Sequence, residues 1–276
     1  MDSMDLVVKI GSMALIRQED NAVDYNTLSR LSADLRPGMI VVSSGATEIG
    51  RVDYGHRTGH ELQGELDDIK TDYAAQGQAI LMENYRRFID PSYSVRQVLV
   101  EHQHFNNPQK REHIRQMLLR CPAQGAIPIV NYNDPVSAKE NRRMELSALR
   151  AQHQQVVECI DNDETAAVIT SLVQANTLVI LSSVEGIYED PHDSSTLIRE
   201  IVGDTPEELL QNVRKQQEHC VGASRAGANG ARAKLEYVLG PAMQGTRVLI
   251  GHARHRLPDL LNGSIPCTTV SLRSSL

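Results

Sequence analysis

The segment Leu6-Val7-Val8-Lys9-Ile10-Gly11-Ser12 carries the clearest structural signal in this chain of 276 residues. Apart from Lys9, its first five residues are apolar and mostly β-branched, and a glycine follows them directly. A short apolar run without polar alternation is typical of a strand that is covered on both faces of a parallel sheet. The segment therefore predicts an inner strand of an α/β protein.

The rest of the chain alternates in the same way between apolar runs and segments with helical spacing of apolar residues. This alternation predicts a three-layer αβα sandwich around a central, mostly parallel sheet. Because no internal repeat or linker interrupts it, we expect one domain over residues 1–276 with two lobes. The predicted strands are residues 6–10, 39–42, 98–100, 126–130, 177–181, 247–250 and 268–270. The predicted helices are residues 24–35, 68–88, 110–119, one from 161 or 162, one from 204–208, and 231–239 before Gly240-Pro241.

The polar segment 138–155 fits either a projecting helical excursion or a mobile flap.

Composition excludes several classes of protein. With 28 Lys and Arg against 35 Asp and Glu, the net charge is 28 − 35 = −7. The sequence shows no concentrated basic face of the kind that binds a nucleic-acid backbone, so nucleic-acid binding is not predicted. No apolar run approaches the ~20 residues of a membrane span, and the start does not resemble a secretory signal, so we expect a cytoplasmic protein without membrane contact.

Metal binding by protein side chains is not predicted either. The four cysteines form no Cys-x-x-Cys pair and are expected to be reduced thiols. The pairs His102 with His104 and His252 with His255 lack an accompanying cluster of carboxylates or thiols, which is typical of surface or loop histidines.

The chemistry is expected just beyond the carboxyl ends of the strands, where an open α/β sheet binds its ligands. Polar residues and glycines that follow strands are therefore the candidates. They occur in Lys9-Ile10-Gly11-Ser12, Ser43-Ser44-Gly45-Ala46, Asn131-Tyr132-Asn133-Asp134, Ser182-Ser183-Val184-Glu185-Gly186, and Gly227-Ala228-Asn229-Gly230 before a helix with Lys234.

Each candidate also has a structural interpretation. Lys9 fits either an edge-strand lysine that reaches water or a cation that meets a bound anion beside Gly11. The loop 227–230 with Lys234 fits either a linker before a solvated lysine or a phosphate-binding loop, although it lacks the Gly-Lys-Ser/Thr ending of a P-loop. Asp161-Asn162-Asp163 fits either helix capping or an acid that orients two lysines.

Taken in order, these segments resemble the amino acid kinase family, and within it the glutamate 5-kinase branch. The resemblance rests on five motifs that span nearly the whole chain but only the kinase domain, with no counterpart of the PUA domain of many relatives. They are Val7-Val8-Lys9-Ile10-Gly11-Ser12, Ser43-Ser44-Gly45-Ala46, Gly77-Gln78 with Leu81-Met82, Ile127-Pro128-Ile129-Val130-Asn131-Tyr132-Asn133-Asp134, and Asp161-Asn162-Asp163 with Ala166.

The resemblance implies a role for each candidate residue. Lys9 and Lys234 would hold the transferred phosphoryl group, and Asp163 would orient both lysines. The substrate-binding lobe would be about residues 1–175 and the nucleotide-binding lobe about residues 176–276. The implied substrate-binding residues are Ser44, Gly45, Ala46, Asp134 and Asn162. The implied nucleotide-binding residues are Lys9, Gly11, Ser182, Ser183, Gly186, Tyr188, Gly227, Ala228, Asn229, Gly230 and Lys234.

The implied reaction is ATP- and Mg²⁺-dependent phosphorylation of the γ-carboxylate of L-glutamate to L-glutamyl 5-phosphate, a step of proline biosynthesis, by a homodimer or homotetramer. Several departures leave alternatives open. Ser183 replaces an aspartate, Asn229 alters the glycine loop, Tyr132 replaces an acid, and the 135–160 connection is longer than usual. A same-fold kinase for another small acid, a phosphonate or a phosphate monoester, or a non-catalytic nucleotide or metabolite sensor, would also fit.

Overall fold

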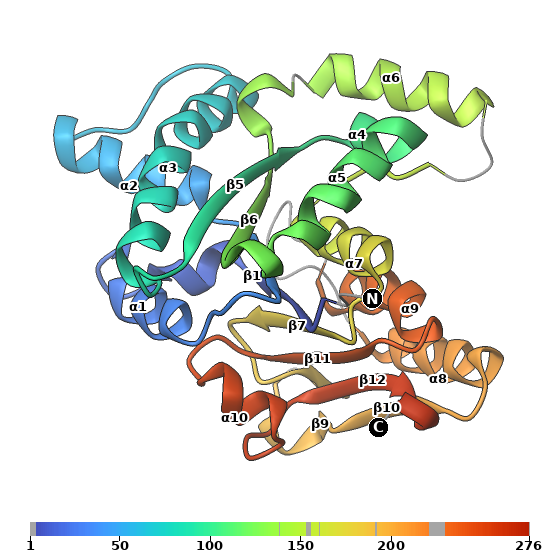
Figure 1. Ribbon diagram of the computed structural model, residues 1–276. Coiled ribbons are helices and arrows are strands. Elements are labelled where there is room, and N and C mark those ends of the chain that lie inside the picture. Colours follow the sequence, from blue (N-terminus) through green and yellow to red (C-terminus); the bar gives the residue numbers. More distant parts are fainter. Residues whose placement is uncertain are drawn as a thin grey trace.

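A central sheet of eight strands organises the computed structural model, which describes residues 4–137, 139–152, 156–159, 161–190, 192–220 and 230–275 (Figure 1). All neighbouring strands run parallel except the antiparallel pair β11 and β12, as the sequence pattern predicts. In spatial order the strands are β10 (Glu200–Gly203), β12 (Thr268–Leu272), β11 (Arg247–His252), β7 (Thr177–Ser182), β1 (Leu6–Ile10), β4 (Met39–Ser43), β6 (Ala126–Tyr132) and β5 (Ser94–Val100).

Strand β1 lies in the middle of this sheet. All five of its residues pair with β4 on one side and with β7 on the other. Its side chains alternate, so that Leu6, Val8 and Ile10 enter one hydrophobic core and Val7 enters the other. The Lys9 side chain lies on the same face of the sheet as that of Val7, and Lys9 is only 7% exposed. The interpretation of Lys9 as an edge-strand lysine is therefore wrong.

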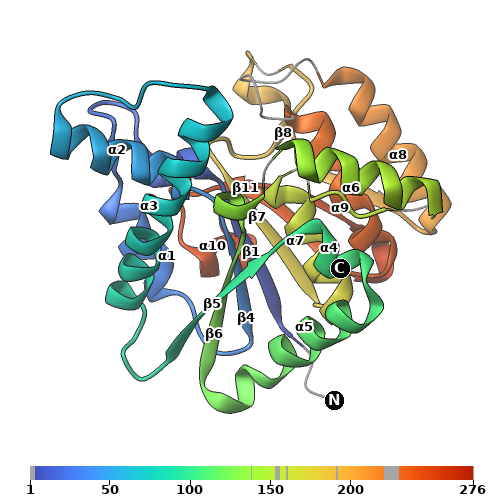
Figure 2. The same ribbon diagram turned by 90° about the horizontal axis from the view of Figure 1, so that it is seen from above.

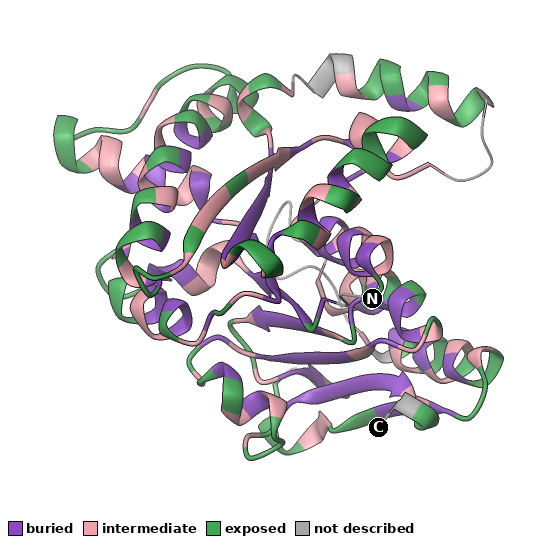
Figure 3. Ribbon diagram, in the orientation of Figure 1, coloured by how far each residue is buried: buried purple, intermediate pink, exposed green. Residues whose placement is uncertain are grey.

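Helices cover both faces of the sheet and complete the three-layer sandwich (Figure 2). Buried residues follow the strands and the inner sides of these helices (Figure 3). One face carries α1 (Tyr25–Ala33), α2 (Ala46–Thr58), α3 (Leu66–Phe88) and α10 (Leu257–Leu261). The other carries α4 (His102–Asn106), α5 (Pro108–Arg120), α7 (Asn162–Val173), α8 (Pro206–His219) and α9 (Gly230–Met243).

Helices α2 and α3 cross at two glycines. A Cβ added to Gly77 would lie 1.8 Å from the carbonyl oxygen of Ala46, and one added to Gly50 would lie 1.9 Å from that of Tyr73. Real Cβ atoms do not approach other atoms so closely, so only glycine lets the two backbones touch. The crossing fixes the first turn of α2, which begins directly after β4.

The structure corrects the predicted end of one helix and shows a helix in the polar segment 138–155. Helix α9 does not end at Gly240-Pro241 but continues to Met243. Proline normally stops a helix because it lacks an N–H donor. Here Pro241 and Ala242 are buried, and their packing against the core maintains the last turn. The polar excursion contains a helix, α6 (Lys139–Gln152), which projects beyond the sheet (Figure 1).

Among the described residues, no helix combines the length and apolar character that a bilayer span requires.

Candidate active site

Two lysines from distant parts of the chain meet on one carboxylate. Lys9 Nζ on β1 lies 2.6 Å from Asp163 Oδ1 on α7, and Lys234 Nζ on α9 lies 2.6 Å from Asp163 Oδ2. The side chains of Lys9 and Asp163 are 9% and 7% exposed, whereas that of Lys234 is 23% exposed. The trio is thus buried on the β1 side and open to solvent at Lys234.

The electrostatic balance of the trio is set by its burial and its charges. Burial raises the pKa of Asp163, but the ammonium groups of Lys9 and Lys234 lower it more, so the net shift is below the usual value. Asp163 is therefore ionised at neutral pH. Two ammonium groups share this single carboxylate, which leaves positive charge for an incoming anion.

The sequence around Asp163 begins a helix at this position. Asp161 is the N-cap of α7, and its Oδ1 accepts hydrogen bonds from the backbone N–H groups of Asp163 and Glu164 at 2.9 and 3.0 Å. Such a cap fixes the first turn, and carboxylates there interact favourably with the helix dipole. Asp161 therefore performs the capping, and Asp163 is the residue that contacts the lysines.

A hydrogen-bonded network of polar side chains lies beside the lysine pair. Asn162 Nδ2 donates to Ser44 Oγ at 3.0 Å and to Asn131 Oδ1 at 2.9 Å. Asn131 Nδ2 in turn donates to Gln78 Oε1 at 2.8 Å. Since these residues come from the end of β4, α7, β6 and α3, the network holds four elements in one arrangement.

No role was predicted for Asn131 or Gln78, although Asn131 was among the candidates that follow a strand. Both stand in motifs that the sequence shows, directly at the end of a strand and directly after Gly77. Their contact across β6 and α3 has no local signal, so the sequence marks the residues but not their pairing.

The first turn of α2 faces the same edge of the sheet. Gly45 has a φ of 107° and precedes Ala46, the first residue of this 13-residue helix. Residues with a side chain rarely adopt that backbone conformation, so glycine is required where the chain turns from β4 into the helix. The N–H groups at this end are oriented to bind an anion.

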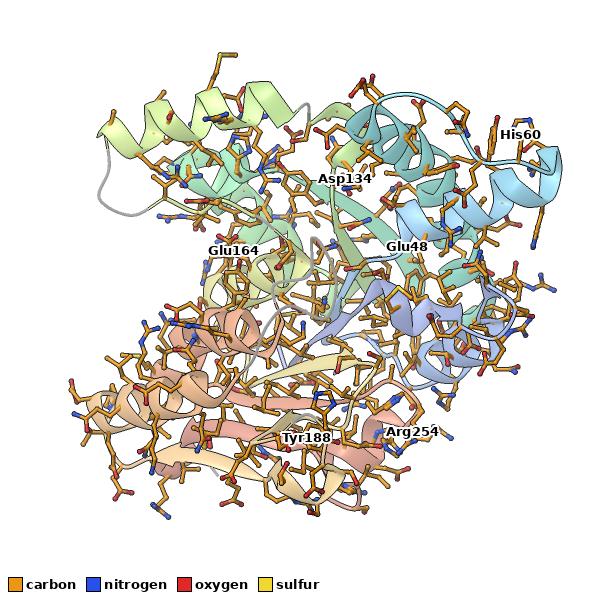
Figure 4. The ribbon with its side chains drawn as sticks, turned by 180° about the vertical axis from the view of Figure 1, so that it is seen from behind. Glu48, His60, Asp134, Glu164, Tyr188 and Arg254 are labelled. Atoms are coloured by element: carbon orange, nitrogen blue, oxygen red, sulfur yellow. The ribbon has the colours of Figure 1, made fainter. Side chains whose placement is uncertain are left out.

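Asp134 begins the short 3-10 turn that follows β6, near Glu48 of α2 (Figure 4). Asp134 is exposed to solvent, although neighbouring protein atoms crowd its carboxyl group. Desolvation is the main reason why the pKa of Asp134 is raised to about 6. The Glu48 carboxylate also raises this pKa, whereas the positive charge of Arg142 lowers it. Asp134 therefore changes charge just below neutral pH.

On the other side of the lysine pair, the predicted nucleotide-binding residues follow β1 and β7. Gly11 N–H donates to Leu181 O at 3.1 Å, and a Cβ on Gly11 would lie 3.8 Å from Lys9 Nζ. Ser182 ends β7, Ser183 is exposed, and Tyr188 lies half-buried in the short strand β8 (Ile187–Tyr188).

Gly186 and Gly230, two of the predicted nucleotide-binding residues, have different structural surroundings. A Cβ on Gly186 would lie 2.3 Å from Thr268 Oγ1, so packing requires a glycine at this position. Gly230 begins α9 with a φ of 64°. Gly227, Ala228 and Asn229 lie outside the described residues.

A charged cluster whose contacts the sequence did not predict includes Glu185 of the 182–186 segment. Glu185 pairs with Arg254, and its Oε2 lies 2.8 Å from His255 Nε2. Tyr188 and Arg254 lie on the same side of the molecule (Figure 4). Glu185 thus supplies a carboxylate two residues beyond Ser183, although two basic side chains already contact it.

The histidines also need one correction. His102 is not a surface residue, because it is 1% exposed, and its Nε2 lies 2.8 Å from Glu145 Oε2 of α6. Within the described ranges, no group of three or more His, Cys, Asp or Glu side chains is placed to hold a metal ion.

The fold and the site together define a class of protein. A mostly parallel sheet with two lysines on one carboxylate, flanked by helix N-termini, is an arrangement suited to phosphoryl transfer, because cations and backbone donors can stabilise the charge on the moving group. The model of the amino acid kinase family matches residues 4–252. The chain belongs to the amino acid kinase family.

The curated relatives include several glutamate 5-kinases. The enzyme of Clostridium perfringens is 29% identical over 279 residues, which cover 95% of this chain and 93% of the relative. The enzyme of Gloeobacter violaceus is 31% identical over 278 residues, which cover 97% of this chain and 68% of the relative. These similarities support a kinase of this family.

Solved structures agree on the fold. Carbamate kinase from Giardia superposes with a TM-score of 0.56 at 13% identity, covering 97% of this chain and 99% of that one. UMP kinase from Bacillus anthracis gives the same TM-score at 12% identity, covering 98% and 97%. At such low identity the likeness concerns the fold alone.

Proposed function

We propose that this protein is an ATP-dependent kinase that phosphorylates the γ-carboxylate of L-glutamate to L-glutamyl 5-phosphate, a step of proline biosynthesis. The observation that carries the proposal is the first turn of α7. Its Asp163 contacts both lysines, and the adjacent Asn162 contacts the Ser44 and Asn131 network. A phosphate held by the lysines would therefore lie next to an acceptor held by the network. The similarity to glutamate 5-kinases supports this choice of acceptor.

The proposed reaction needs positioning and charge stabilisation rather than a general base. A γ-carboxylate has an ordinary pKa of about 4.3 and is already an ionised nucleophile at neutral pH. Its oxygen attacks the γ-phosphorus of ATP, the new O–P bond forms as the bond to the bridging oxygen breaks, and ADP leaves. Lys9 and Lys234 stabilise the charge on the transferred group, and Asp163 holds the two ammonium groups in place.

The acceptor would be held by the two charged groups on its α-carbon, the ammonium group and the α-carboxylate. The carboxylate of Asp134 would bind the ammonium group, and Ser44, Asn162 and the N–H groups at Gly45 and Ala46 would bind the α-carboxylate. This assignment uses every predicted substrate residue.

The nucleotide would lie across the ends of β1 and β7. Gly11, Ser182, Ser183, Tyr188 and Gly230, with residues 227–229, would contact it, and the lobe division at about residue 175 remains a prediction. Mg²⁺ commonly binds through substrate phosphates and one or two carboxylates, and here it would come with ATP. Mg²⁺ would add positive charge to those phosphates. Cytoplasmic location and a homodimer or homotetramer also remain predictions.

A coupled assay tests the acceptor. We expect L-glutamate to release ADP and, with hydroxylamine present, to give the hydroxamate that reports an acyl phosphate. Other small acids, phosphonates and phosphate monoesters form the comparison panel. A clear preference for one of these over glutamate would overturn the proposed acceptor, and saturable nucleotide binding without turnover of any acceptor would indicate a sensor.

The raised pKa of Asp134 gives a second expectation. Below about pH 6 the carboxyl group is protonated and loses its attraction for an ammonium group, so kcat/KM for glutamate should fall on the acidic side with an apparent pKa of about 6. In Glu48→Gln this limb should move to lower pH, because a like charge is removed. In Asp134→Asn the limb should vanish and kcat/KM should fall about 100-fold. A limb near pH 6 that persists in Asp134→Asn would show that another group causes it.

A further inference from the structure

Arg142 of α6 connects two walls of the proposed acceptor site. Its guanidinium donates hydrogen bonds to the backbone carbonyl oxygens of Glu158, at 2.6 Å, and of Cys159. The same group lies over the ring of Tyr132, with Cζ 4.9 Å from the ring centroid. One side chain thus joins α6, the end of β6 and the segment that precedes α7.

The segment before α7 is held from several sides. Asn106 exchanges two hydrogen bonds with the backbone of Val157, at 2.9 and 2.7 Å. Glu158 N–H donates to Glu164 Oε1 at 3.0 Å, and the Glu158 carboxylate pairs with Arg150 of α6. The backbone here is therefore fixed by side chains rather than by a sheet or a helix.

Cys159 shows why this fixation is needed. Its φ is 49°, in the left-handed region that non-glycine residues rarely adopt. Such a conformation persists only where surrounding contacts enforce it. Cys159 is buried, and Arg142 holds its carbonyl oxygen. Two residues later the chain reaches Asp161, the cap that sets the position of Asn162 and Asp163.

The opposite end of the connection is Tyr132 and its neighbours. Tyr132 OH lies 2.8 Å from Ser137 Oγ, and only Asn133 separates Tyr132 from the turn that begins at Asp134. The ring is 5% exposed, so the guanidinium stacks on a fixed surface. Glu145, one turn further along α6, pairs with the buried His102 and holds the helix against α4.

We propose that Arg142 is a positioning residue of the acceptor site, which holds Tyr132 and the 158–159 backbone at a fixed separation so that Asp134 and Asn162 reach the acceptor together. This inference rests on the proposed function, since it takes these two residues to bind the acceptor. Lysine cannot replace arginine here, because an ammonium group that donates to the two carbonyl oxygens has no planar surface to stack on the Tyr132 ring at the same time.

The test compares Arg142→Lys with Arg143→Lys, an exposed position on the same helix that also keeps its charge. We expect KM for the acceptor to rise about tenfold or more in Arg142→Lys while KM for ATP changes less than about twofold, since only the acceptor walls move apart. Arg143→Lys should match the unaltered protein in both constants. Equal increases in both KM values, or an unchanged acceptor KM, would overturn the inference.

A second measurement does not depend on catalysis. Amide hydrogen exchange at Val157 and Glu158 should become faster by about tenfold in Arg142→Lys but not in Arg143→Lys. Unchanged exchange would contradict the proposal that Arg142 fixes the 158–159 backbone. The acceptor for the kinetic test is the compound that the panel identifies, so rejection of glutamate leaves the role of Arg142 measurable. If glutamate is the acceptor and its KM does not change, the proposed function stands and the role of Arg142 fails.

Discussion

Asp163→Asn is expected to lower kcat for ADP release about 1,000-fold. A neutral amide cannot compensate two ammonium groups, and its NH₂ group would face one of them as a second donor. Lys9 and Lys234 would then no longer be held together at the transferred group. Because Lys9 is buried, the unpaired charge should also reduce the free energy of unfolding by about 3 kcal/mol. Steady-state kinetics and urea denaturation measure the two effects.

Lys234→Met separates catalysis from stability in this experiment. It removes the more exposed lysine and leaves the buried pair of Lys9 and Asp163 intact. We expect a similar loss of kcat with a change in unfolding free energy of less than about 1 kcal/mol. If folded Asp163→Asn keeps kcat within about threefold of the unaltered protein, the carboxylate does not organise the site.

Gly77→Ala is expected to destabilise the protein by about as much as Asp163→Asn does. The new Cβ would lie 1.8 Å from the carbonyl oxygen of Ala46, so α2 and α3 would have to separate. Overpacking of this kind costs about 3 kcal/mol. Because Ala46 begins α2, the separation should also displace the helix end that would face the proposed acceptor and raise the KM of that acceptor about tenfold or more. Urea denaturation and kinetics at a temperature where the variant is folded provide the readouts.

Gly55→Ala is the matched control. Gly55 also lies within α2, but a Cβ added there meets no atom within 4 Å. Alanine favours the helix over glycine, so this variant should gain about 0.5–1 kcal/mol and retain its kinetics. Equal stability of Gly77→Ala and the unaltered protein would mean that the two helices do not touch at this point.

Local signals predicted most elements because local chemistry forms them. The apolar run of β1, the Asp161 cap of α7 and the Pro206 start of α8 each depend on residues that are neighbours in sequence. The same signals failed for α2, whose two internal glycines and few apolar residues weaken its helical pattern. They also placed the end of α9 too early, since the burial of Pro241 and Ala242 is a tertiary effect.

The site residues likewise divide into those that local sequence marks and those that only tertiary contacts bring together. The alternation of apolar runs and helices, the glycine after β4 and the lysine within an apolar run could all be found in the printed chain, because they arise from backbone conformation and side-chain burial over a few residues. The meeting of Lys9, Asp163 and Lys234 required the order of β1 and β7 in the sheet and the direction in which each side chain leaves its element.

The same holds for Arg142 and Tyr132, which no spacing rule relates. Contacts between distant segments depend on topology, register and packing over the whole chain, and these are properties of the folded molecule rather than of any short run of residues.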